Sequence, residues 1–387
     1  MLRALLGILG TVLVVWSGFG ALLSTAYSGD RAAEARFCEK YYVCDPGRVL
    51  DDIKANRTVE DLTLMVKRDP HFPFEWANLG DALSYTGRTA EAEHCFRMAV
   101  SLSPRWPPVL IRAVKFYFGH DKPQEAVPLA ADIVDQVPNF DGEVFDGYLK
   151  HLPVKEVLEK GLPQQNPRPA RTWLGFVIAN GEWPAVQETW KWVTERGFAD
   201  AKTTNEYVSW LVKKHPEEAP TVWRAYLGEL AGEYGKSEFV FNGGFEKDFT
   251  GSILDWTYQK TPGVQVTADR TNPAEGNWCL RVQFDGEHNT GDTGLREYVV
   301  LPAGRYRFHV KVRTEGLSTD QGVRIQLGTE YASEAFLGTR GWTAVDIPVQ
   351  VGQLKVVQIQ LVRTPSQKFE NKIQGTLWLD SVRIEKL

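Results

Sequence analysis

Polar side chains that form good hydrogen bonds alternate with apolar ones along several stretches of the last third of the chain. Arginine and lysine are multiple donors and a glutamine amide both donates and accepts, so together they suit hydroxyl and carboxylate groups. Apolar and polar residues in strict alternation indicate β-strands with one buried side and one polar side. The candidate residues for such a polar side are Arg305, Arg307, His309, Lys311, Arg324, Gln326, Gln358 and Gln360, with Trp378 as an aromatic platform.

If these strands share one sheet, they form a basic, polar binding face. Its chemistry predicts an acidic or hydroxyl-rich polysaccharide as the ligand. The alternative interpretation is an outer face that is simply solvated, because alternation by itself always produces one polar side.

Signatures of catalysis are absent from the sequence. It contains no Gly-x-Ser-x-Gly elbow, no phosphate-binding glycine loop and no His-Glu-x-x-His zinc motif. The seven histidines are scattered singly, and nothing pairs Glu334 with Asp346 as the acid and base of a glycosidase. We therefore expect a protein that is not an enzyme.

Overall composition is that of a globular protein, with 387 residues and 43% hydrophobic content. This length allows two or three domains. The formal net charge of −5 argues against nucleic-acid binding, which normally brings a basic excess.

The four cysteines do not have the spacing of a zinc site. Cys38 and Cys44 lie close together near the start of the chain, and a disulfide between them would suit an oxidising compartment. Two free thiols are equally compatible with the spacing. Cys95 and Cys279 occur in apolar patterns and are expected to be buried thiols.

Residues 1–29 contain an uncharged run from Ala4 to Gly29 after a single arginine, Arg3. As a helix this run is long enough to cross a bilayer, which favours an uncleaved membrane anchor. A signal peptide cleaved after Ala26 is the alternative. Either interpretation places the rest of the chain in the periplasm or cell exterior, beginning with a linker over residues 30–45.

Residues 46–234 have the apolar spacing of amphipathic helices, and one stretch is especially regular. It reads Trp76-x2-Leu79-Gly80, then Leu83 and Gly87, then Ala92, Phe96, Ala99 and Pro104. The small residues at Gly80, Ala92 and Ala99 let two helices approach closely, with Phe96 in the seam. This pattern resembles a tetratricopeptide repeat, except that Leu83 stands where tyrosine is usual. A weaker copy follows over residues 110–138.

The resemblance implies an all-α solenoid that binds a protein partner along one face. Tyr85 and Trp106 are the candidate partner-binding residues. Most other tryptophans of this region are expected to be core residues, because they recur at helical spacing.

Residues 235–387 change to the alternation of β-strands, with Gly- and Pro-rich turns between them. Strands are predicted around residues 280–284, 306–312, 323–327, 357–361 and 377–384, which indicates an antiparallel sandwich. The region opens with Asn242-Gly243-Gly244-Phe245-Glu246 and closes with Gly375-Thr-Leu-Trp-Leu-Asp380. Together with Gly276-Asn-Trp-Cys-Leu280, these motifs resemble carbohydrate-binding modules of the galactose-binding-like jelly-roll type.

That resemblance implies a structural calcium ion held by the two carboxylates that match the family's ligands, Glu246 and Asp380. Carbonyl oxygens of the loop over residues 270–276 would complete the site. The alternative is a pair of surface carboxylates without a metal.

Taken together, the sequence predicts a membrane-anchored, extracytoplasmic scaffold protein. Its helical repeats would bind a protein and its β-sandwich a glycan, as in proteins of cell-envelope polysaccharide assembly or export. Two alternatives stay open. One is a pure assembly factor with a structural β domain, and the other is an accessory subunit of a carbohydrate-active enzyme.

Overall fold

The computed structural model describes residues 59–369 and 371–387. The chain divides into two compact units, with the boundary between Phe198 and Ala199. The predicted anchor over residues 1–29, the linker over 30–45 and the Cys38–Cys44 pair all lie outside the described residues. Among the helices that are described, none combines the length and the apolar character that crossing a membrane requires.

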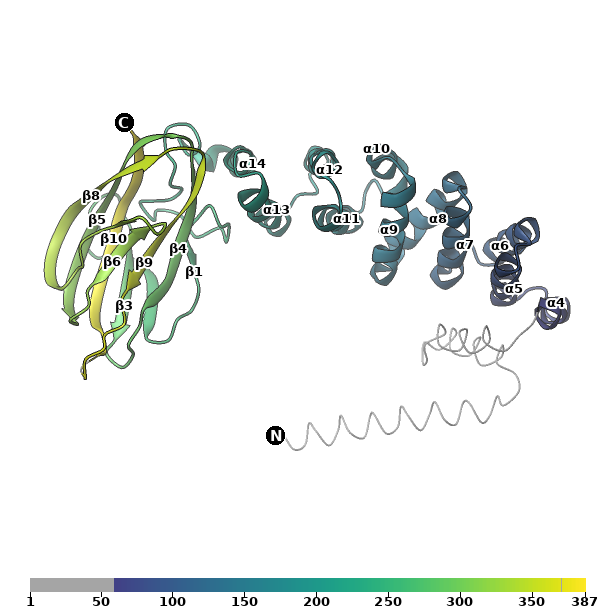
Figure 1. Cartoon of the computed structure of the whole chain (residues 1–387), viewed down its shortest axis with the longest axis horizontal. Helices are drawn as coiled ribbons and strands as arrows, with labels where there is room; N and C mark the ends of the chain where they lie inside the picture. Colours follow the sequence, from purple (N-terminus) through teal and green to yellow (C-terminus); the bar gives the residue numbers. More distant parts are fainter. Residues whose placement is uncertain (1–58, 370) are drawn as a thin grey trace. The chain divides into compact units, whose positions relative to one another are not determined.

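The first unit is helical, as predicted, and its successive helices pack side by side (Figure 1). Five of its helices carry proline in the first turn, where the missing N–H costs no hydrogen bond. The elements are α4 (Val59–Arg68), α5 (Pro73–Tyr85), α6 (Thr89–Leu102), α7 (Pro107–Gly119), α8 (Pro123–Gln136), η1 (Pro138–Phe140), α9 (Asp141–His151), α10 (Val154–Glu156), the π-helical turn η2 (Val157–Gly161), α11 (Pro167–Asn180) and α12 (Trp183–Glu195).

Helices α5 and α6 make the close approach that the sequence predicts. The Phe96 ring is fully buried against Gly80, where a Cβ atom would lie only 3.0 Å from the ring. Ala92 and Ala99 are also fully buried on the same side of α6. The small residues therefore set the spacing of this helix pair.

The two candidate partner-binding residues of this unit differ in their surroundings. Tyr85 ends α5 and is 95% exposed. Trp106 precedes α7 and packs edge-on against Phe74, with the ring centres 4.0 Å apart. Trp106 is therefore partly a packing residue, whereas Tyr85 is wholly available to solvent.

The second unit begins with α13 (Ala201–Lys214), α14 (Ala219–Leu227) and η3 (Gly228–Ala231) and continues into two five-stranded antiparallel sheets. Trp223 of α14 is fully buried and lies 6.3 Å from the Phe241 ring. The Asn205 amide donates a 3.1 Å hydrogen bond to the Thr250 carbonyl oxygen. These contacts join the last two helices to the segment that leads into the sheets.

The two sheets stack face to face (Figure 1), and we name each after a central strand. The β9 sheet has the order β1-β4-β9-β6-β7, and the β5 sheet has the order β2-β3-β10-β5-β8. The strands are β1 (Thr257–Tyr258), β2 (Val264–Asp269), β3 (Cys279–Asp285), β4 (Asp292–Leu301), β5 (Gly304–Ser318), β6 (Val323–Leu327), β7 (Tyr331–Ala332), β8 (Gly338–Val351), β9 (Lys355–Arg363) and β10 (Gln374–Lys386).

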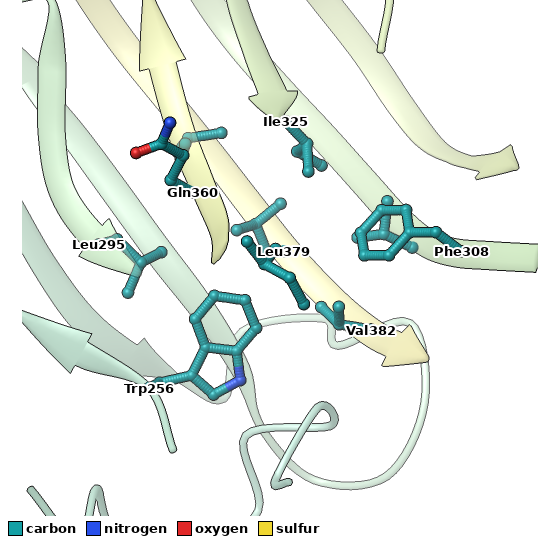
Figure 2. A pocket seen from close by; sticks show the side chains of 10 residues that line it. Trp256, Leu295, Phe308, Ile325, Gln360, Leu379 and Val382 are labelled. Carbon is teal, nitrogen blue, oxygen red and sulfur yellow. The ribbon is translucent and has the colours of Figure 1, made fainter. Parts of the chain in front are cut away.

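Apolar side chains of both sheets meet in one core. Tyr306, Phe308 and Ile359 point inward and are at most 1% exposed, as the alternation predicts. Figure 2 shows Trp256, Phe308, Leu379 and their neighbours around a void between the sheets, whose volume is only about 10 Å³. A void of that size holds a single water at most. This void therefore cannot hold a sugar.

The thiols of Cys95 and Cys279 are both buried, as predicted. Burial raises the pKa of Cys95 to about 11 and that of Cys279 to about 12. Both side chains stay protonated at neutral pH and are therefore poor nucleophiles.

Candidate functional site

The candidate binding residues do not share one sheet, so the single face expected from the sequence is wrong. Arg305, Arg307, His309, Lys311 and Trp378 belong to the β5 sheet, whereas Arg324, Gln326, Gln358 and Gln360 belong to the β9 sheet. The apolar alternates of the two sheets face each other across the core, so the polar alternates point in opposite directions.

Basic side chains at one end of the β5 sheet are neutralised by carboxylates. Arg307 pairs with Glu385, and His309 Nδ1 lies 2.9 Å from Asp346 Oδ1. Lys311 Nζ lies 2.8 Å from Glu275 Oε1. This end is a ladder of cross-strand ion pairs, and the exposed Arg305 beyond it has no carboxylate partner among the described residues.

Trp378 does not form an open platform. Its side chain is 6% exposed, and its indole N–H donates a 2.8 Å hydrogen bond to Asp269 Oδ2. The Arg313 guanidinium covers the ring at 3.9 Å from the ring centre.

The outer side of the β9 sheet carries a different set of groups, which we call the glutamine face. Its members are Arg296, Tyr298, Arg324, Gln326, Gln358 and Gln360. Two rows cross the sheet in register, with Arg296 opposite Gln360 and Gln360 opposite Gln326, and with Tyr298 opposite Gln358. All six are half-buried except the exposed Arg324. The Gln360 amide donates a 3.3 Å hydrogen bond to Gln326 Oε1.

Arg296 and Tyr298 were not among the residues expected from the sequence, because strand β4 was not predicted. A signal was available in the apolar alternates Leu295, Val299 and Leu301, which are buried on the inner side of β4. The charged Glu297 occupies an inward position between Leu295 and Val299, so the apolar alternation of β4 is broken and the strand is not recognised from the sequence.

A pocket adjoins the glutamine face at the end of strands β1 and β4. Its volume is about 400 Å³, within the range of pockets that take small ligands. Arg296 belongs to both the pocket and the face, and its guanidinium donates a 2.8 Å hydrogen bond to Asp292. The lining residues of this loop pocket are Gln259, Thr261, Pro262, His288, Asn289, Thr290, Gly291, Asp292 and Arg296.

A buried arginine at the end of β9 fixes the loop that lines this pocket. Arg363 is 4% exposed, and it donates to Asn289 Oδ1 at 2.8 Å and to the Thr290 carbonyl at 3.0 Å. It also donates to the carbonyls of Gln321 and Asn371. One guanidinium therefore ties three loops together. Sequence reasoning missed Arg363, although it continues the inward series Val357, Ile359 and Leu361.

The carboxylates proposed as calcium ligands have other partners. Glu246 Oε1 accepts hydrogen bonds from the backbone N–H groups of Asn277 and Trp278 at 2.7 and 3.0 Å. Asp380 Oδ2 accepts from the N–H groups of Ala274 and Glu275 at 2.8 and 3.0 Å.

The loop thus presents N–H groups to these carboxylates, where carbonyl oxygens were expected. A cation between them would face the positive ends of four N–H dipoles, so the arrangement does not fit calcium, which needs six or more oxygen ligands. In the part of the chain that the structure describes, no cluster of three or more His, Cys, Asp or Glu could hold a metal.

Gly276 is the residue of this loop that is most sensitive to substitution. Its φ is +64°, and an added Cβ would lie 2.2 Å from Glu246 Oε1. We expect Gly276→Ala to lower the free energy of unfolding of the second unit by about 2–4 kcal/mol, through strain and loss of the Glu246 contacts. Urea unfolding checks this against Gly341→Ala, because a Cβ at Gly341 meets nothing within 4 Å. Equal stability of the two variants would contradict the role given to this loop.

Among the comparisons with known proteins, only the one with solved structures gives matches. No protein-family model matches the chain, and no curated protein sequence matches it. The β region resembles carbohydrate-binding modules. The xylan-binding CBM22-1 domain of Xyn10C from Paenibacillus barcinonensis is 16% identical, with 37% of this chain and 91% of that domain covered and a TM-score of 0.27.

Two further carbohydrate-binding modules match with comparable sequence identities and TM-scores. The C-terminal family 22 carbohydrate-binding module of Xyn10B from Clostridium thermocellum is 12% identical, covering 39% of this chain and 96% of that one, with a TM-score of 0.26. TmCBM61, solved with β-1,4-galactotriose, is 17% identical, covering 39% and 99%, with a TM-score of 0.26. Similarity this distant assigns no ligand to the present chain.

Proposed function

We propose that the β-sandwich binds a hydroxyl-rich polysaccharide on the glutamine face, with the loop pocket taking part of the chain. The observation that carries this proposal is the pair of cross-strand rows that place three glutamine amides and Tyr298 on one half-buried surface. Each amide offers donors and an acceptor, which matches the mixed character of sugar hydroxyls. The Gln360–Gln326 hydrogen bond is long, so hydroxyl groups replace it at low cost.

Charge on this surface favours a neutral ligand. Arg296 is already paired with Asp292, which leaves Arg324 as the remaining cation of the glutamine face in the described chain. Tyr298 supplies a flat apolar surface beside the amides, a combination that suits a sugar ring with its alternating apolar and hydroxyl surfaces.

For the whole chain, we propose a membrane-anchored, extracytoplasmic binding protein that is not an enzyme. The uncharged run over residues 4–29 supports the anchor and the location. The packing of Phe96 on Gly80 supports a tetratricopeptide-like arrangement of the helices, and the fully exposed Tyr85 marks the surface for a protein partner. Such a protein suits the assembly or export of an envelope polysaccharide.

Binding of neutral polysaccharides to the full-length chain tests the glycan proposal. Isothermal titration with soluble xylan and β-1,4-galactan should detect binding. Gln358→Ala/Gln360→Ala should weaken it roughly thirtyfold, because two lost hydrogen bonds of about 1 kcal/mol each amount to about 2 kcal/mol. The matched control is Gln265→Ala/Gln350→Ala, which removes two exposed amides from the β5 sheet. The proposal is wrong if neither polymer binds, or if both double variants bind equally well.

A further inference from the structure

Cations on the outer side of the β5 sheet fall into two groups. Arg307, His309 and Lys311 are paired with carboxylates at one end, as described above. Towards the other end lie Arg281 and Arg313, and in the described chain neither of them has a carboxylate oxygen within 4.0 Å. Arg305, at the first end, is also unpaired, but it is exposed, whereas Arg281 and Arg313 are half-buried beside Trp378.

The two arginines lie in one row across the sheet, with Trp378 between them. Trp378 of β10 is in register with Arg281 of β3 on one side and with Arg313 of β5 on the other. The Arg313 guanidinium lies 3.9 Å from the centre of Trp378 and 5.6 Å from that of Trp342 on β8. We call the four residues Arg281, Trp378, Arg313 and Trp342 the Arg–Trp strip. Stacking on Trp378 fixes the Arg313 guanidinium plane without using its N–H groups.

Hydrogen-bonding capacity is left over in this strip. The Nε atoms of both arginines are buried and lack an acceptor, so a ligand would have to be bound by the Nη groups. Arg281 makes one side-chain hydrogen bond, from Nη2 to Gln283 Oε1 at 2.9 Å. The carboxylate beside the strip, Asp269, accepts from the Trp378 indole and from the Thr271 N–H, and it is the main counter-charge here.

A third arginine extends the positive charge beyond the strip. Arg270 follows β2 directly and stacks over Trp278 at 3.9 Å. Trp342 is half-buried, and its indole N–H donates a 2.9 Å hydrogen bond to the Asn272 carbonyl of the same loop. The Asn272 contact joins the loop that carries Arg270 to the Trp342 end of the strip.

We infer that the Arg–Trp strip is a second binding site, which takes the carboxylate groups of an acidic polysaccharide. The Arg313 guanidinium, held by its stack on Trp378, can form two parallel hydrogen bonds to a carboxylate through its two Nη groups, and the half-buried Trp342 ring beside it offers a surface to the sugar that carries the acid. Arg281 and Arg313 are two strand spacings apart, about 10 Å. One small anion cannot reach both, so the site selects a polymer with repeated charges.

This site does not depend on the glutamine face, which lies on the opposite sheet and has neutral chemistry. The two proposals can therefore fail separately. A chain that bound a neutral polymer through one sheet and an acidic one through the other would bridge two glycans.

Polygalacturonate is the probe for the test, with the full-length chain in 50 and 200 mM NaCl. We expect binding that weakens at the higher salt concentration, because screening reduces contacts between charges. Arg281→Gln/Arg313→Gln should reduce the affinity at least tenfold at 50 mM NaCl. The matched control, Arg307→Gln/Lys311→Gln, removes the same charge from the paired end and should change it less than threefold.

Loss of the Arg313 stack risks unfolding the sheet, so a second variant is needed. Arg270→Gln/Arg281→Gln leaves the Arg313–Trp378 contact intact and should still reduce the affinity about fivefold, with an unchanged thermal midpoint. Gln358→Ala/Gln360→Ala should bind polygalacturonate as the wild type does. The inference is overturned if the wild type does not bind, if both strip variants bind normally, or if the paired-end control loses as much affinity as they do.

Discussion

Replacing Arg363 with leucine is expected to lower the free energy of unfolding of the second unit by about 3–5 kcal/mol, a loss typical of removing one partner of a buried charged group. The guanidinium is 4% exposed and satisfies the carbonyls of Thr290, Gln321 and Asn371 together with the side chains of Asn289 and Thr319. Leucine offers none of these donors, so several buried acceptors lose their partner at once.

The same change should alter the loop pocket, because Asn289 and Thr290 belong to its lining. Urea unfolding followed by tryptophan fluorescence measures the stability, and hydrogen exchange of the amides at residues 289–291 reports on the loop. The matched control is Arg305→Leu, since Arg305 is exposed and has no side-chain partner among the described residues. If Arg363→Leu lowers the free energy of unfolding by less than 1 kcal/mol, the three loops do not depend on Arg363 for their stability.

Strand pairing explains why the sequence predicts the strands but not the site. Alternation identifies β3, β5, β6, β9 and β10, because each has apolar residues at every second position. Alternation is a local property, whereas sheet membership depends on contacts between distant residues. Consecutive strands β5 and β6 lie in different sheets, while β5 pairs with β10. The candidate residues were therefore correctly placed on strands and wrongly placed on one face.

Strands that the sequence did not reveal have weak apolar patterns for identifiable reasons. The first half of β8 is mostly exposed, and its buried residues begin only at Ile347. Strand β4 contains a buried charge, Glu297, at an inward position. Arg363 likewise ends the inward series of β9. A charged residue at a position where the alternation predicts an apolar one is therefore the sequence feature that indicates both Glu297 and Arg363.

The distribution of charge could not be predicted from residue types alone. The sequence shows five basic residues alternating along β5, from Arg305 to Arg313. Their partners, including Glu275, Asp346 and Glu385, come from segments that are distant in sequence. Arg307, His309 and Lys311 are paired, whereas Arg305 and Arg313 have no carboxylate partner among the described residues. A basic pattern on one strand therefore says little about a binding face until the neighbouring strands are known.

Glu297 should make the stability of the second unit fall as the pH rises, and Glu297→Gln should remove this effect. Its side chain is fully buried, Oε1 accepts a 2.9 Å hydrogen bond from the Phe241 N–H, and Oε2 has no partner. Burial raises the pKa of Glu297 well above 4.5, the Phe241 N–H opposes this, and the nearby Asp255 carboxylate adds to it. The folded state therefore favours the neutral acid.

A raised pKa fixes the direction of the pH dependence. Below pH 4.5 the Glu297 carboxyl is neutral in both the folded and the unfolded state, so it adds no pH dependence. Above pH 4.5 the carboxyl ionises in the unfolded state but not in the folded one, and this stabilises the unfolded state relative to the folded state. Stability is therefore lost progressively from pH 4.5 up to the raised pKa. Glutamine keeps the acceptor for Phe241 and cannot ionise. One pKa unit is worth about 1.4 kcal/mol, so we expect the variant to be more stable at pH 8 by at least that amount.

Urea unfolding of both proteins between pH 4 and pH 8 measures the difference. Asp255 keeps its own raised pKa in both proteins, and it contributes equally to the two curves apart from its interaction with Glu297. The Tyr234 hydroxyl, whose pKa burial also raises, stays neutral throughout this range. Glu334→Gln changes an exposed carboxylate and should leave the pH profile unaltered. If the curves for wild type and Glu297→Gln stay parallel from pH 4 to pH 8, then Glu297 is ionised in the folded state and has a counter-charge or water that compensates its burial.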